Sequence, residues 1–194
     1  RAELCEFDIA SGAVRRLLRS KSVLFEAPNW HPDGRWIVVN AGGRLYRVDA
    51  QSPAGLEEIP SPGLPPLNND HLITPDGRWH LVSADDGQLY RLPWEGGAAE
   101  RLSTPKHPRR CFRHFLHGVS PDGATLAYVG TEMADGDEWG RRALWLLELA
   151  TGHERLVGDG CSPADGPDFA PDGRHLLSWG RSGMGPGEFN LPHT

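Results

Sequence analysis

Side chains able to bind a ligand or move a proton recur just before four Pro-Asp-Gly tripeptides in this chain. With the four prolines aligned, the position six residues earlier holds Glu26, Asn69, Phe115 and Asp165. The position four residues earlier holds Pro28, His71, His117 and Pro167, and Asn29 and Asp168 come one position later. The candidate ligand-binding residues are Glu26, Asn29, Asn69, Asp70, His71, His117, Asp165 and Asp168.

These carboxylates, imidazoles and amides are compatible with three kinds of chemistry. His71, His117 and a carboxylate could bind a divalent metal ion, the one cofactor that the sequence suggests. The same groups could hydrogen-bond a sugar, or supply an acid and a base for proton transfer. A purely structural reading stays open, in which the polar groups satisfy one another and channel water, as buried polar groups must.

The Pro-Asp-Gly tripeptides indicate what holds these side chains in place. Proline presets φ for the first corner of a turn, aspartate hydrogen-bonds the local backbone, and glycine takes the positive φ that ends the turn. The aspartates are Asp33, Asp76, Asp122 and Asp172, separated by 43, 46 and 50 residues. That spacing is typical of a four-stranded propeller blade.

Apolar or alternating runs flank each turn, so each repeat is predicted to form strand, turn, strand, loop, strand, turn and strand. The predicted fold is all-β: a single β-propeller domain over residues 1–194, built from four-stranded antiparallel blades. Whole blades are expected at residues 24–60, 68–103 and 114–158, and half-blades at residues 3–18 and 165–182. The first strand of each propeller blade lines the central channel, so the candidate residues should converge at the channel mouth.

The two half-blades are complementary, because the first supplies the last two strands of a blade and the second supplies the first two. Pairing them within one chain would close a four-bladed ring and remove exposed strand edges. Pairing them between two chains would give an eight-bladed homodimer with two-fold symmetry. As a third option, the chain is part of a larger propeller, with Glu188, Phe189, Asn190 and Leu191 beginning a further strand.

Composition narrows the function classes. The formal net charge of −6 argues against nucleic-acid binding, and the basic cluster at residues 106–114 is expected to be a solvated loop. No apolar run is long enough to cross a membrane, and the sequence shows no nucleophile elbow or zinc-protease motif. A cytoplasmic location is expected, or a periplasmic one if a signal peptide was removed.

The repeated Pro-Asp-Gly pattern resembles the TolB-type, WD40-like (PD40) β-propeller repeat over roughly residues 3–180. The segments Asn68-Asn69-Asp70-His71 and His117-Gly118 further resemble a bacterial TolB-like subgroup of mostly unassigned function. Related propellers include a periplasmic interaction protein, the gating domain of prolyl oligopeptidase-type peptidases and a metal-assisted oligogalacturonate lyase. The resemblance therefore implies a fold and leaves the reaction open.

The sequence favours a binding module without catalytic activity, with its site at the channel mouth. Its ligand would be a small molecule or carbohydrate, or its partner a protein. The alternative is a metal-assisted carbohydrate-active enzyme, lyase-like or hydrolase-like, that uses His71 and His117.

Overall fold

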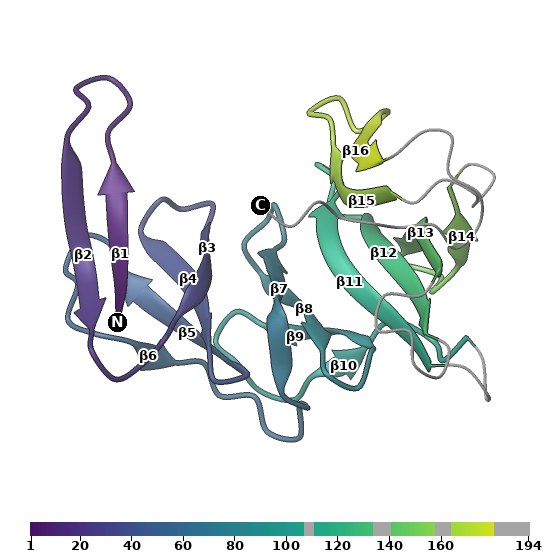
Figure 1. Ribbon diagram of the computed structural model, residues 1–194, viewed down its shortest axis with the longest axis horizontal. Helices are drawn as coiled ribbons and strands as arrows, with labels where there is room; N and C mark the ends of the chain where they lie inside the picture. The colour runs from purple at the N-terminus through teal and green to yellow at the C-terminus, as the bar shows by residue number, and fades with distance from the viewer. Residues whose placement is uncertain (107–110, 134–140, 158–163, 181–194) are drawn as a thin grey trace.

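The computed structural model describes residues 1–106, 111–133, 141–157 and 164–180, in which every regular element is a β-strand (Figure 1). Three four-stranded antiparallel sheets and two hairpins follow one another along an open arc. This confirms the predicted all-β propeller architecture of four-stranded blades. Within the described ranges, no helix is long and apolar enough to cross a membrane.

The strands follow the predicted order. The first hairpin consists of β1 (Ala2–Phe7) and β2 (Val14–Ser20). Blade 1 consists of β3 (Glu26–Trp30), β4 (Trp36–Ala41), β5 (Arg44–Asp49) and β6 (Glu57–Glu58). Blade 2 consists of β7 (Leu67–Ile73), β8 (Trp79–Ala84), β9 (Leu89–Pro93) and β10 (Glu100–Arg101). Blade 3 consists of β11 (Cys111–Val119), β12 (Thr125–Met133), β13 (Arg141–Glu148) and β14 (Glu154–Leu156), and the last hairpin of β15 (Ala164–Phe169) and β16 (Leu176–Gly180).

The Pro-Asp-Gly turns connect the first two strands of each blade. In blade 2, the Gly77 amide donates to the Thr74 carbonyl oxygen at 2.8 Å, and the Arg78 amide donates to Asp76 Oδ1 at 3.0 Å. Gly77 has a φ of +72°, a conformation that costs a residue with a Cβ atom but not glycine. The turns therefore fold as their residue types predict.

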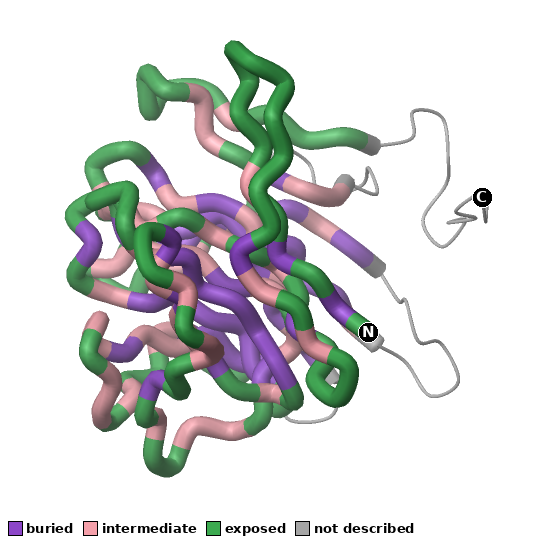
Figure 2. The backbone as a smooth tube through the Cα atoms, turned by 90° about the vertical axis from the view of Figure 1, so that its left-hand side faces the viewer, coloured by how far each residue is buried: buried purple, intermediate pink, exposed green. Residues whose placement is uncertain are grey.

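Hydrophobic cores lie between successive blades. The first hairpin contributes Leu4 and Leu17 to a core shared with Ile37 and Val39 of blade 1. Other residues of blade 1 pack against blade 2, and blade 2 packs against blade 3 in the same way. Figure 2 shows the buried backbone running through the blades, whereas hairpin tips are exposed. These shared cores hold neighbouring blades together, which places their first strands side by side.

The two terminal hairpins form separate two-stranded sheets at opposite ends of the arc (Figure 1). The ring closed within one chain, one of the three predicted arrangements, is therefore not observed in the described residues. Apolar side chains on these hairpins face solvent, with Phe7 61% and Trp179 53% exposed. The homodimer and the larger propeller stay predictions, and the strand expected at Glu188–Leu191 lies outside the described residues.

Candidate functional site

The first strands of the blades lie next to one another: β3 contacts β7, β7 contacts β11, and β11 contacts β15. Each carries an irregularity in its pairing with the second strand of its sheet, between Leu67 and His71 in β7 and between Leu116 and Gly118 in β11, for example. Such bulges re-aim side chains and are over-represented near active sites. In these strands the irregularities lie at or next to the candidate residues.

A pocket of 260 Å³ lies where three first strands meet. Its lining residues come from β7, β11 and β15 and from the middle strands of blade 3. They are Asn68, Asn69, Asp70, Phe115, His117, Val129, Thr131, Arg142 and Asp165. The pocket therefore combines carboxylates, an imidazole, a guanidinium and amides with the apolar surfaces of Phe115 and Val129.

Asp165 is the centre of the charged part of this pocket. Arg142 Nη1 donates to Asp165 Oδ2 at 3.0 Å, and only 4% of the Arg142 side chain is exposed. His117 Nε2 lies 3.5 Å from Asp165 Oδ1, which also accepts the Gly166 amide at 2.8 Å. The buried guanidinium and the imidazole thus hold the carboxylate in a fixed orientation.

Asp70 brings a second carboxyl group into the same pocket. Burial raises the pKa of Asp70; the His117 charge and a hydrogen bond from Asn68 lower it, and the Asp165 charge raises it further. The net effect is a pKa above the ordinary value of 3.8. Asn68 Nδ2 donates to Asp70 Oδ2 at 3.1 Å, while Asn68 Oδ1 accepts the Asp70 amide at 2.9 Å. A carboxyl group that holds its proton more readily can donate as well as accept a hydrogen bond.

The structure brings together half of the sequence-predicted set. Asn69, Asp70, His117 and Asp165 line the pocket, whereas Glu26, Asn29, His71 and Asp168 do not. Glu26 and Asp168 are exposed. Asn29 instead links the first two blades, because its Nδ2 donates to the His71 carbonyl oxygen at 2.9 Å.

His71 belongs to the packing between blades 1 and 2. Its side chain is buried, and its Nε2 lies 3.4 Å from the Val38 carbonyl oxygen in β4. Burial lowers the pKa of His71 below its ordinary value, despite the hydrogen bonds to backbone oxygens. This histidine is therefore directed at blade 1 and not at the pocket.

The predicted metal ligands do not come together. Across the described ranges, no group of three His, Cys, Asp or Glu side chains is arranged to hold a metal ion. The proposed set of His71, His117 and a carboxylate is not assembled, because His71 is committed to the blade 1 interface. The described residues therefore do not form the predicted metal site.

Arg142 and Thr131 were missed from sequence because they lie on middle strands. They face each other in the β12–β13 pairing. β12 has 9 residues and β13 has 8, against 6 in each of β4 and β5, so blade 3 extends further along the pocket. The available signal was the step of 50 residues from Asp122 to Asp172, the longest in the chain.

Comparison with known proteins places this fold among propellers. No protein-family model matches the sequence. An uncharacterized protein of Agrobacterium fabrum (strain C58) is 35% identical over 157 residues, which cover 79% of this chain and 50% of that protein. The chain thus spans about half the length of this curated relative.

Three solved structures share the architecture. A candidate TolB from Agrobacterium tumefaciens superposes with a TM-score of 0.75 at 30% identity, covering 90% of this chain and 63% of that one. TolB from Acinetobacter baumannii superposes with a TM-score of 0.58 at 19% identity, covering 93% of this chain and 48% of that one. Oligogalacturonate lyase in complex with manganese superposes with a TM-score of 0.65 at 13% identity, covering 88% of this chain and 50% of that one. The last two likenesses concern the fold alone.

Proposed function

We propose that this chain, a TolB-like β-propeller by its repeats, sheets and structural neighbours, is a binding module for a small polar ligand. The observation that carries the proposal is the charged pocket assembled from three successive first strands. Asn69 and Asp70 reach it from blade 2, His117 from blade 3 and Asp165 from the last hairpin. Convergence of polar groups in one concave site is the usual mark of a ligand pocket.

The chemistry of the pocket favours a ligand that carries hydroxyl groups. Asp165 is already neutralised by Arg142, so a strongly charged ligand would have to displace an existing ion pair. Asp70 adds a second carboxyl group, which holds its proton more readily than an ordinary aspartate because burial raises its pKa. Phe115 offers an apolar surface of the kind on which a sugar ring packs. The volume of 260 Å³ suits a ligand of about one sugar residue.

Calorimetric titration with a panel of neutral monosaccharides and uronic acids tests the proposal. We expect Asp165→Asn to weaken binding about ten- to a hundredfold, because a hydrogen bond to a charged group is worth about 1.5–3 kcal/mol. Asp168→Asn is the matched control, since Asp168 comes from the same strand and is exposed outside the pocket. His117→Gln provides a second variant that leaves the Arg142–Asp165 ion pair in place. Equal losses in the Asp165 and Asp168 variants would contradict the proposed site.

A carbohydrate-active enzyme is the second candidate. It is favoured by the proximity of Asp70, whose pKa is raised, to the ion-paired Asp165, since two carboxyl groups in different environments can divide acid and base roles. The metal-assisted form has less support, because the described side chains do not assemble a metal site. Incubation with polygalacturonate, followed by absorbance of unsaturated products, tests the lyase form. Turnover that is lost in Asp70→Asn would favour the enzyme over the binding module.

Association between copies is a separate proposal, supported by the complementary hairpins. β1–β2 and β15–β16 each have a free edge in the described structure and carry exposed apolar side chains such as Phe7 and Leu177. Exposed edges of this kind tend to pair with another strand. Native mass spectrometry across a concentration series should show a dimer that forms by half-blade exchange. A monomer at every concentration would count against it.

A further inference from the structure

The interface between blades 1 and 2 contains a slot that is filled by Trp94. The indole ring lies 4.1 Å from the His31 ring and 4.9 Å from the His80 ring, measured between centroids. The Arg47 guanidinium lies 5.5 Å from the Trp94 ring, and its Nη1 is 3.0 Å from Glu95 Oε2. The Trp94–Glu95 pair of blade 2 is thus held by an aromatic contact and an ion pair with blade 1.

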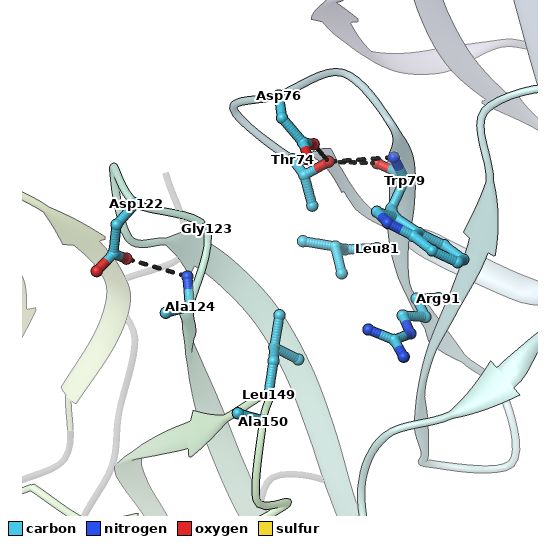
Figure 3. A pocket seen from close by; sticks show the side chains of 10 residues that line it. All are labelled: Thr74, Asp76, Trp79, Leu81, Arg91, Asp122, Gly123, Ala124, Leu149 and Ala150. Carbon is cyan, nitrogen blue, oxygen red and sulfur yellow. Dashed lines mark hydrogen bonds between the residues drawn. The ribbon is translucent and has the colours of Figure 1, made fainter.

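The corresponding slot between blades 2 and 3 is open. It forms a pocket of 430 Å³, shown in Figure 3. The lining residues are Thr74, Asp76, Trp79, Leu81, Arg91, Asp122, Gly123, Ala124, Leu149 and Ala150. The correspondence follows from the backbone: Trp94 N donates to the Arg78 carbonyl oxygen at 2.9 Å, and Leu149 N donates to that of Ala124 at 2.9 Å. Leu149 therefore takes the place of Trp94.

Smaller side chains account for the opening. Thr74 stands where the first interface has His31, and Leu149-Ala150 where it has Trp94-Glu95. The space around the turn glycines Gly77 and Gly123 also differs between the two slots. A Cβ atom on Gly77 would lie 2.5 Å from His31 Nε2, whereas one on Gly123 would meet nothing nearer than Pro75 Cδ at 3.6 Å.

The arginine–tryptophan contact found in blade 1 beside the filled slot is also present in blade 2 beside the open slot. Arg47 lies 4.9 Å from the Trp36 ring in blade 1, and Arg91 lies 4.8 Å from the Trp79 ring in blade 2. Arg47 pairs with both Glu57 and Glu95, whereas Arg91, within the described part of the chain, pairs with Glu100 alone. Arg91 therefore has capacity for a second carboxylate, on the side where Arg47 holds Glu95.

We propose that the slot between blades 2 and 3 binds a peptide segment of a partner protein in which an aromatic residue is followed by an acidic residue. The segment would reproduce what Trp94-Glu95 does within the chain. Its ring would pack between Trp79 and Leu149, and its carboxylate would pair with Arg91. Asp76 and Asp122 line this slot, and the equivalent turn aspartates Asp33 and Asp76 belong to the filled interface, where Glu95 is accommodated through its ion pair with Arg47. This site is separate from the His117–Asp165 pocket.

The test uses the full chain and a capped peptide with the sequence of residues 92–96, Leu-Pro-Trp-Glu-Gly. Titration calorimetry should detect binding of this peptide and none of a version with alanine in place of tryptophan. Glutamine in place of glutamate should weaken binding about two- to fivefold, the range expected for a solvent-exposed ion pair. Absence of binding at millimolar peptide would overturn the proposal.

Protein variants locate the site. Thr74→His combined with Leu149→Trp rebuilds the filled slot from inside and should abolish binding. Arg91→Gln should make the glutamate and glutamine peptides bind equally, and Arg101→Gln, outside the pocket, should preserve the difference between them. Undiminished binding in the double variant would overturn the proposal. If that variant does not fold, the Arg91 comparison decides, and an unchanged preference for glutamate in Arg91→Gln counts against the slot.

Discussion

His80 should make this protein sensitive to acid, because it is a fully buried imidazole with no opposite charge beside it in the described ranges. Its exposed fraction is 0%, its ring stacks on Trp94, and its Nε2 lies 3.1 Å from the Trp94 carbonyl oxygen. Nδ1 is buried without a hydrogen-bond partner among the described residues. Burial lowers the pKa of His80 to about 4 from 6.5; the hydrogen bond to Trp94 opposes this, and the charges of His71, His31 and Arg47 add to it.

The sign and size of the effect follow from linkage. The folded protein binds the His80 proton less readily than the unfolded chain does, so this contribution to stability is complete above about pH 6.5. It is lost as the pH falls from 6.5 towards about 4. A difference of about 2.5 in pKa corresponds to about 3 kcal/mol, a large fraction of the stability of a typical domain.

His80→Leu is the perturbation that isolates this contribution. The equivalent positions in blades 1 and 3 are Ile37 and Leu126, so the interface between blades accepts an aliphatic side chain there. At neutral pH the variant should have a free energy of unfolding about 1 kcal/mol lower than that of the wild type, because it lacks the hydrogen bond to Trp94. As the pH falls to about 4, the free energy of unfolding of the variant should rise by about 3 kcal/mol relative to that of the wild type.

Urea denaturation followed by tryptophan fluorescence at a series of pH values measures this difference. His71 also has a lowered pKa but is present in both proteins, so its contribution largely cancels. His175→Leu is the control, because that histidine is exposed and lies beside Asp172. A wild-type minus His80→Leu stability difference that does not change between about pH 7 and pH 4 would refute the reasoning.

Two further predictions concern packing between and within blades. Glu154→Gln should lower the free energy of unfolding, measured by urea denaturation, by about 3 kcal/mol, because Lys106 and Tyr128 would lose the buried carboxylate that contacts both. Glu148→Gln, at an exposed position, is the control and should lower it by less than about 0.5 kcal/mol. Equal costs would contradict a structural role for this network. Gly77→Ala should cost about 2 kcal/mol more than Gly34→Ala, because the two glycines have φ values of +72° and +71° but only the Cβ at position 77 would meet His31. A matching cost in thermal melts would show that backbone strain alone matters.

The turns and the strand order could be predicted because they rest on local chemistry. The Arg35 and Arg78 amides both donate to the aspartate two residues earlier, which any Pro-Asp-Gly sequence can arrange for itself. Repetition at blade spacing then implied four-stranded sheets. How the terminal hairpins are arranged could not be read in this way, because pairing of distant strand edges is not a local property.

The site was predicted only in part, because aligned residues do not occupy equivalent places in their strands. His71 and His117 share a position relative to proline. His117 lies within the irregularity of β11, between Leu116 and Gly118, whereas His71 follows the one in β7 and pairs in register with Val82. A bulge determines which face receives the next side chain, so the two imidazoles point to different neighbours. Sequence spacing carries no signal for where a bulge falls.

Both pockets arise where one repeat departs from the others on a shared scaffold. At one position of the second strand, Asn40 in blade 1 donates to the Asn68 carbonyl oxygen of the next first strand, and Ser83 in blade 2 accepts the Leu116 amide. Blade 3 has Val129 at that position, which can make neither bond, and Val129 lines the pocket beside Asp165. The slot at Leu149 opens by the same logic, through loss of an aromatic filler. Within a ring of similar blades, binding sites are therefore to be sought where the residue that joins neighbouring blades is missing.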